Sequence, residues 1–215
     1  MIEINRGEHG LIMGKTGSGK TQWAKSWLLR LSGRSIIVDT EDGIDFPKEK
    51  FYTVSVADAL HLARSSPDKR FLVRIDTHRW SEEADTLFQG LLRSQSTLLY
   101  VDEANDFSRV NDTMPSYVDV LRKGRKHGLS VWSSTQRPAL IDKTIYTQAT
   151  HKVFFTLSEY DIKSWVGKFA QSAVALLPQA PFKSYRWVYE APSGELHLFE
   201  PVKMYSWPDL KRGPI

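Results

Sequence analysis

The sequence predicts an α/β fold, with a mostly parallel central sheet flanked by helices and a β-hairpin near the C-terminal end. Short apolar runs alternate with amphipathic stretches along most of the chain, a pattern typical of parallel strands joined by helices. The first apolar run leads into a glycine-rich loop and then a helix, which is the order of a nucleotide-binding unit. The last two strand-like runs surround a turn at residues 191–194, which predicts the hairpin.

The expected strands are short apolar runs bounded by polar or turn residues. They lie at residues 9–13, 35–40, 51–55, 71–76, 97–101, 129–135 and 151–157, with the hairpin strands at 184–190 and 195–202. Several of these runs are apolar throughout and do not alternate with polar residues. We therefore expect strands that are buried on both faces, as in a parallel sheet between two layers of helices.

The expected helices carry apolar residues at helical spacing. Trp23, Trp27 and Leu31 share one face of the stretch that follows the glycine-rich loop, and Gly33 can close this helix. Serines at three further positions can act as N-caps. The remaining helices are expected after residues 55, 81 and 158, in a stretch that ends near residue 126, and at residues 139–147. The helix that starts after residue 158 is expected to reach residue 169.

The composition limits the class of protein. A chain of 215 residues with 41% hydrophobic content suits one domain, which we expect at residues 1–202, with a tail at 203–215. There are no cysteines, so disulfides, thiolate metal sites and cysteine nucleophiles are excluded. The sequence predicts neither a membrane span nor secretion, because no stretch is long and apolar enough and the N-terminal residues are polar. The net charge of +4 is compatible with nucleic acid as a partner.

The glycine-rich loop matches the phosphate-binding pattern G-x-x-x-x-G-K-[ST] at every fixed position. Glycines allow the backbone to curl so that its N–H groups point at phosphate oxygens. We expect Lys20 to reach the β- and γ-phosphates and the Thr21 hydroxyl to bind Mg²⁺. The predicted nucleotide-binding residues are Gly14, Lys15, Thr16, Gly17, Ser18, Gly19, Lys20 and Thr21.

Two carboxylates follow the apolar run at residues 97–101. Since parallel strands end at one edge of a sheet, Asp102 is expected beside the Mg²⁺ site, where it would hold the ion through water. Glu103 is expected to polarise the water that attacks the γ-phosphate. The alternative for Glu103 is an ordinary acidic residue at the start of a helix.

A third group of residues lies at 124–138. The strand at residues 129–135 delivers Gln136 to the same edge, where its side chain can contact the γ-phosphate or hold the attacking water. Arg125 lies at the end of the preceding helix, and this position suits an arginine that contacts the nucleotide of a neighbouring subunit. The alternatives are a solvated basic helix end, or the same role for Arg122 or Arg137.

The order of the phosphate loop, Asp102-Glu103, the Arg-x-x-Gly at 125–128 and the Thr-Gln-Arg-Pro at 135–138 resembles the FtsK–HerA superfamily of DNA-pumping ATPases. In size the chain is most similar to genome-packaging ATPases of internal-membrane, double-jelly-roll viruses. The resemblance implies a RecA-like P-loop NTPase core with ATP and Mg²⁺ as cofactors. It implies roles for Lys20 and Thr21 on phosphate and Mg²⁺, and for Glu103 on the attacking water. It further implies roles for Asp102 on the metal, for Gln136 as a sensor and for Arg125 as a finger in trans.

The same resemblance implies partners and a location. The expected partners are double-stranded DNA bound without sequence specificity, further copies of this chain in a ring (a pentamer or hexamer), and a capsid vertex or portal protein. The expected location is the virion or the host cytoplasm. One departure is Trp132, which stands where the superfamily has a small aliphatic residue inside the strand.

Two polar segments are candidates for DNA contact: residues 105–114 with Arg109, and residues 77–80 with His78 and Arg79. Ordinary surface loops are the alternative. Three other functions remain open: a filamentous-phage-type assembly or secretion ATPase of the same superfamily, a small nucleotide kinase, and a non-catalytic nucleotide-binding module. Intact Lys20, Asp102 and Glu103 argue against the last.

Overall fold

The computed structural model describes residues 2, 4–48, 50–66, 68–75, 81–94 and 96–203. Its centre is a nine-stranded sheet with the order β11-β10-β9-β1-β8-β5-β2-β4-β3. The strands are β1 (Gly10–Met13), β2 (Ser35–Asp39), β3 (Tyr52–Thr53), β4 (Arg70–Arg74), β5 (Leu98–Val101), β8 (Ser130–Thr135), β9 (His151–Phe154), β10 (Trp187–Glu190) and β11 (Leu196–Phe199). The strands from β9 to β3 pair in parallel, and the antiparallel hairpin β10–β11 joins the sheet beside β9. The predicted α/β fold class with a terminal hairpin is therefore confirmed.

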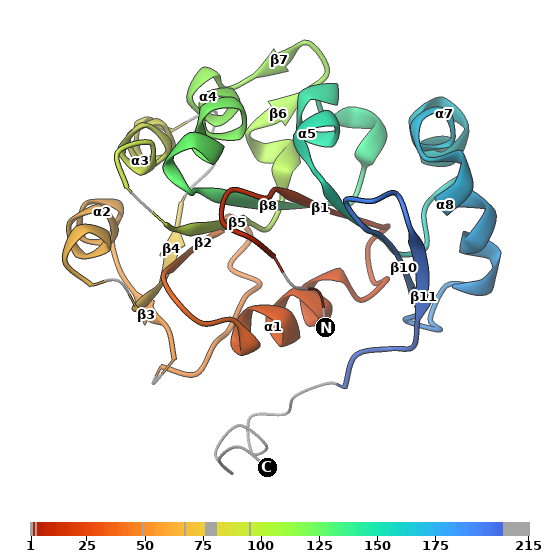
Figure 1. The fold of residues 1–215 in the computed structure, drawn as a ribbon, viewed down its shortest axis with the longest axis horizontal. Helices are drawn as coiled ribbons and strands as arrows, with labels where there is room; N and C mark the ends of the chain where they lie inside the picture. Colours follow the sequence, from red (N-terminus) through yellow and green to blue (C-terminus); the bar gives the residue numbers. More distant parts are fainter. Residues whose placement is uncertain are drawn as a thin grey trace.

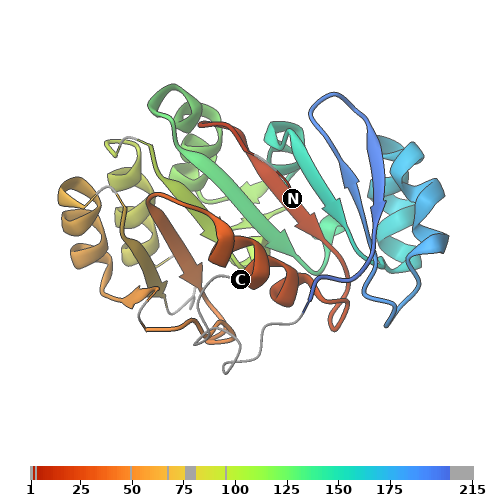
Figure 2. The ribbon, with the colours of Figure 1, turned by 60° about the horizontal axis from the view of Figure 1, so that its bottom comes forward.

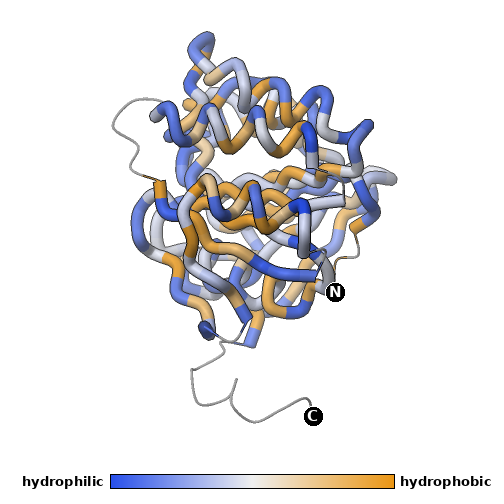
Figure 3. Tube along the Cα trace, turned by 90° about the vertical axis from the view of Figure 1, so that its left-hand side faces the viewer, coloured by the Kyte–Doolittle hydropathy of each residue, from blue (hydrophilic) through white to orange (hydrophobic). Residues whose placement is uncertain are grey.

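The helices form a layer on each face of the sheet (Figure 1). α1 lies on one face, and α2, α3, α4 and α5 lie on the other. The helices are α1 (Lys20–Arg30), α2 (Val56–Ser65), α3 (Glu82–Leu91), α4 (Pro115–Lys123), α5 (Lys143–Gln148), α6 (Glu159–Asp161), α7 (Gly167–Phe169) and α8 (Gln171–Leu176). The buried hydrophobic residues form two clusters, which pack between the helices and the sheet. Figure 3 colours the chain by hydropathy and shows hydrophobic segments in its strands and helices. The burial of every β1, β2, β5 and β8 residue follows from cover on both faces.

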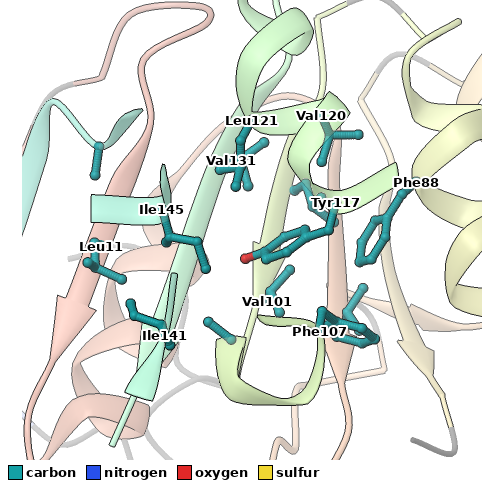
Figure 4. Packing of buried hydrophobic residues seen from close by; sticks show 14 of the residues in the cluster. Leu11, Phe88, Val101, Phe107, Tyr117, Val120, Leu121, Val131, Ile141 and Ile145 are labelled. Atoms are coloured by element: carbon teal, nitrogen blue, oxygen red, sulfur yellow. The ribbon is translucent and has the colours of Figure 1, made fainter. Parts of the chain in front are cut away.

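The core under α3 and α4 is built around aromatic rings. Tyr117 of α4 packs against Phe88 of α3, with ring centroids 5.1 Å apart, and Phe107 meets Phe88 edge-on at 5.2 Å (Figure 4). The Tyr117 hydroxyl lies 2.5 Å from Ser133 Oγ in β8, so the buried phenol has a polar partner. This core supports β5 and β8 from one side.

The core under α1 explains the unusual Trp132. Its ring lies 4.2 Å from that of Trp27 and stacks on Trp23 at 6.2 Å. A side chain at Gly10 in the neighbouring strand would overlap this ring, so the glycine gives the indole its space. The large Trp132 ring in β8 thus fits beside β1 because Gly10 has no side chain.

Several element boundaries differ from the predictions. The helix expected at residues 139–147 is interrupted, because Ile141 is extended and Asp142 begins α5 by accepting the Thr144 N–H at 2.8 Å. The helix expected at 159–169 contains a π-helical turn at Ile162–Val166. The polar segment 105–114 includes a small hairpin, β6 (Ser108–Arg109) with β7 (Asp112–Thr113), and α8 was not predicted. The expected tail beyond residue 203 lies outside the described residues.

Candidate active site

The phosphate loop begins where β1 ends and is attached to both neighbouring strands. The backbone N–H of Gly14 donates to the carbonyl of Thr135, the last residue of β8, at 3.2 Å. The backbone N–H of Lys15 donates to the Thr156 carbonyl, after β9, at 2.9 Å. Gly17 and Gly19 have φ of +74° and +104°, a region that favours glycine. The loop is therefore pre-formed by the sheet, and α1 starts directly behind it.

Inside the loop, two polar side chains are buried. The Lys20 ammonium donates to the Lys15 carbonyl at 3.4 Å, across the curve of the loop. Burial lowers the pKa of Lys20, while Glu103, Asp102 and Glu41 favour its charged form. The Ser18 hydroxyl is buried and makes no hydrogen bond with any residue that the structure describes. A loop with an ammonium and an unpartnered hydroxyl at its centre can accept phosphate oxygens.

The two predicted carboxylates follow β5, two strands away from the loop with β8 between them. Asp102 accepts a hydrogen bond from the Tyr100 hydroxyl at 2.9 Å. Burial raises the pKa of Asp102 to about 6. Glu103 accepts the backbone N–H of Asn105 at 3.3 Å, and burial raises its pKa to about 7. Both carboxyl groups thus lie in a low-dielectric site within electrostatic range of Lys20.

Gln136 joins the loop to the carboxylates. Its backbone N–H donates to Glu103 Oε2 at 3.2 Å, and its side-chain oxygen accepts a hydrogen bond from the Thr16 hydroxyl. Since β8 lies between β1 and β5, Gln136 at its end is the natural bridge between them. The structure therefore brings the predicted loop, Glu103 and Gln136 together at one edge of the sheet.

Arg125 lies at the other end of the strands. It is exposed, and its Nε donates to the Gly7 carbonyl at 3.2 Å, before the start of β1. The length of β8 separates it from Gln136, so within one subunit its side chain is remote from the phosphate loop. Arg122 lies at the exposed end of α4. Arg137 follows Gln136 and lines the loop side of the molecule.

Of the two candidate DNA segments, only one is described. The β6–β7 hairpin holds Arg109 beside a hollow of about 610 Å³ that Glu103 and Gln136 also line. Val110 at the tip of this hairpin is 52% exposed. Residues 77–80, with His78 and Arg79, lie outside the described residues.

The oxygen donors near the loop suit Mg²⁺. This ion is usually held by one or two protein oxygens together with phosphates and water. Thr21 carries the first hydroxyl of α1. The buried Asp102 carboxylate accepts the Tyr100 hydroxyl with Oδ1, and Oδ2 is the second oxygen that could bind a metal ion. The donor set of one hydroxyl and one carboxylate fits a magnesium nucleotide.

Sequence reasoning missed several residues around this site. Asp39, at the end of β2, is buried and raises the pKa of Asp102, while the exposed Glu41 lines the pocket above the loop. Tyr100 points back from β5 to Asp102. Phe155 and Tyr185 lie against Gly19. Asp39 and Glu41 could have been predicted at this site, because they follow the apolar run at residues 35–38. The aromatic contacts could not, because they depend on packing between distant parts of the chain.

Comparisons with known proteins extend this picture. A family model described as Zonular occludens toxin (Zot) matches residues 10–162. Protein P9 of Pseudoalteromonas phage PM2 is 25% identical over 148 residues, which are 67% of this chain and 66% of that protein. The chain therefore matches slightly less than two thirds of the length of this relative.

Solved structures share the fold. The genome packaging NTPase B204 from Sulfolobus turreted icosahedral virus 2, in complex with ATP-gammaS, has a TM-score of 0.74 and 21% identity, covering 93% of this chain and 100% of that one. VirB4 of Thermoanaerobacter pseudethanolicus has a TM-score of 0.62 and 12% identity, covering 98% of this chain and 93% of that one. At these identities the likeness establishes the fold. In the part of the chain that the structure describes, no helix has the length and apolarity needed to cross a bilayer.

Proposed function

Since the chain belongs to the zonular occludens toxin (Zot) family and is a P-loop ATPase of the FtsK–HerA type, we propose that it is an ATP-hydrolysing motor. The motor moves double-stranded DNA and packages a viral genome into a preformed capsid. The observation that carries this proposal is the bridge made by Gln136, which contacts Thr16 of the phosphate loop and Glu103 after β5. A nucleotide γ-phosphate and its attacking water would lie between these groups.

The residues of the loop have the role of binding and orienting ATP. Backbone N–H groups of the loop other than those of Gly14, Lys15 and Ser18, which donate to carbonyls within the protein, would bind phosphate oxygens together with the Lys20 ammonium. The positive end of α1 adds to their effect. Thr21 and Asp102 would hold Mg²⁺, which when bound neutralises charge on the phosphate oxygens. The unpartnered Ser18 hydroxyl supports a bound oxyanion in this loop.

Glu103 is the proposed general base. A base works best when its pKa lies near the working pH, and burial raises the pKa of Glu103 to about 7. Its two oxygens are oriented by the backbone N–H groups of Asn105 and Gln136. Glu103 would accept a proton from the attacking water, and Gln136 would report on the γ-phosphate through its side chain.

Arg125 is proposed to act on the nucleotide of a neighbouring subunit. Its distance from the loop of its own subunit supports this assignment, because a finger in trans must lie on a face away from that loop. A ring of identical subunits would bring this face of one copy to the loop of the next. We place the motor at a capsid vertex, in the virion or the host cytoplasm, with DNA held by cationic loops such as that of Arg109.

The decisive experiment measures steady-state ATP hydrolysis with Mg²⁺, with and without long double-stranded DNA, at low and moderate salt. The proposal expects DNA to raise the rate, and expects salt to weaken the effect because phosphate contacts release counterions. The exposed Arg109→Ala variant is expected to need more DNA for the same stimulation, whereas Arg93→Ala, beyond α3, is the matched control. Hydrolysis by a chain that neither binds DNA nor responds to it would eliminate the translocation proposal.

A filamentous-phage-type assembly or secretion ATPase is the second candidate, and the Zot family match favours it over a kinase. It would use the same loop, Glu103 and Gln136, so the ATP site does not distinguish a packaging motor from an assembly ATPase. The hydrolysis assay distinguishes them, because DNA-independent hydrolysis supports the assembly function. Transfer of phosphate to a nucleoside or nucleotide acceptor in place of water would instead support the kinase.

A further inference from the structure

The pocket above the phosphate loop continues toward the C-terminal segment. It has a volume of about 610 Å³, and the first turn of α1 forms its floor through Thr21 and Gln22. Its lining includes the polar residues Lys20, Glu41 and Gln136. It also includes four uncharged residues from three separate parts of the chain, which we call the apolar end: Phe155, Tyr185, Pro201 and Val202. In Figure 2 the chain leaving β11 passes beside the loop between β1 and α1.

Tyr185 is held at this apolar end by the fold. A Cβ placed on Gly19 would lie 3.1 Å from Tyr185 Cδ1 and 3.7 Å from Phe155 Cε1, so both rings border the loop. Tyr185 is nevertheless 47% exposed, which leaves part of its surface open. Its φ of +56° is unusual for a residue with a side chain, and such backbone strain concentrates at binding sites.

Thr156 ties this aromatic segment to the phosphate loop. Its carbonyl accepts the Lys15 N–H at 2.9 Å, and its hydroxyl donates to the Ala180 carbonyl at 3.0 Å. A tight turn follows, in which Ser184 N–H donates to the Pro181 carbonyl at 3.0 Å, and Tyr185 comes directly after it. Thr156 therefore links the segment that leads to Tyr185 to the phosphate loop.

We propose that this apolar end is the base-binding subsite of the nucleotide, in which the Tyr185 ring stacks on a neutral purine base and Pro201 and Val202 enclose its edge. The inference depends on the proposed nucleotide site, since the phosphates must lie in the loop for the base to reach Tyr185. The pocket residues Phe155, Tyr185, Pro201 and Val202 carry no charge, so an uncharged aromatic ring is a group that suits them. Each stacked base is worth about 1–3 kcal/mol by alanine substitution, or about 5- to 150-fold in affinity.

The test compares two ligands, ATP and inorganic tripolyphosphate, binding to wild type and to variants at position 185. Tyr185→Ala is expected to weaken ATP binding by about tenfold or more and to leave tripolyphosphate binding unchanged. Tyr185→Phe keeps the ring and should bind ATP as wild type does. Tyr52→Ala removes a tyrosine of similar exposure (46%) in the edge strand β3 and is the matched control. Circular dichroism and thermal unfolding check that each variant is folded.

The outcomes separate this inference from the proposed function. Unchanged ATP affinity in Tyr185→Ala overturns the base subsite. An equal loss of affinity for ATP and for tripolyphosphate also overturns it, because Tyr185 would then act by supporting the loop. Equal affinity of wild type for the two ligands also overturns it. If wild type bound neither ligand, the proposed ATP site itself would be wrong.

Discussion

The backbone N–H of Gln136 donates a hydrogen bond to Glu103 Oε2 at 3.2 Å, and this contact joins the ends of the neighbouring strands β5 and β8. The side chain of the same glutamine contacts Thr16 in the phosphate loop. One residue therefore links Glu103, the proposed general base, to the loop that would surround the γ-phosphate.

Replacing Glu103 by Gln should leave ATP binding intact and lower the rate of hydrolysis by about 10²- to 10⁴-fold, because the amide cannot accept the proton of the attacking water. Steady-state turnover and ATP affinity are measured on the same preparation. Glu82→Gln, at the exposed start of α3, is the control and should hydrolyse normally. Wild-type turnover by Glu103→Gln would exclude this carboxylate as the base.

Replacing Lys20 by Ala should weaken ATP binding by about 10- to 150-fold, since a charged hydrogen-bond donor to phosphate is lost. Lys25→Ala, one turn further along α1, keeps the loop unchanged and should bind ATP as wild type does. Equilibrium titration with a fluorescent ATP analogue measures both. Equal affinities in the two variants would contradict the proposed phosphate contact.

Replacing Arg125 by Ala should preserve ATP binding and reduce turnover by about 10³- to 10⁵-fold if this arginine acts as a finger. Mixing Arg125→Ala with Lys20→Ala subunits should then restore part of the activity, because an intact loop can meet an intact arginine across an interface. Arg64→Ala, in the exposed last turn of α2, is the control and should hydrolyse ATP normally. No recovery in the mixture would argue for a role within one subunit.

Replacing Gly10 by Ala should destabilise the protein by about 1–3 kcal/mol, because the new methyl group would overlap the ring of Trp132 in a packed core. Urea unfolding followed by tryptophan fluorescence gives the free energy of unfolding. Gly43→Ala adds a methyl group where no atom lies within 4 Å and is the control. Equal stability of the two variants would show that the Trp132 pocket can expand.

His9 should make stability depend on pH. Its Nε2 lies 2.9 Å from the Leu121 carbonyl, and its Nδ1 accepts the Val131 N–H at 3.0 Å, so the ring is bound in its neutral form. Burial lowers the pKa of His9 from 6.5 to about 4. The unfolded chain therefore binds a proton first as the pH falls. Stability from this group is complete above about pH 6.5 and is lost progressively toward pH 4, by about 3 kcal/mol in total.

The variant His9→Asn isolates this contribution. Asn cannot titrate, so the free energy of unfolding of the variant should be lower at pH 7.5 and should change less than that of wild type between pH 7.5 and pH 4. Urea unfolding at several pH values measures the difference between the two proteins. Parallel pH profiles would contradict the assignment of this pH dependence to His9.

Much of the fold could be predicted because its signals are local. The phosphate loop is a contiguous pattern, and the caps at Ser55, Ser81 and Ser158 each accept the N–H three residues later, as their positions indicated. The hairpin β6–β7 and the π-helical turn in 162–166 were missed because their residues are mostly polar or lack a clear period. The break at Ile141 was missed because the extended residue is itself apolar and fits the helical pattern.

By itself, the sequence determined the class of fold, the identity of the phosphate loop and the carboxylates that accompany it, because each depends on neighbours along the chain. The tertiary structure alone decided that β8 lies between β1 and β5, and so that Gln136 reaches both Thr16 and Glu103. It also decided that Tyr185 borders Gly19 and that Arg125 lies at the far end of the strands. These relations arise from the order of strands in the sheet, which depends on packing between residues far apart in the chain and leaves no local pattern in it.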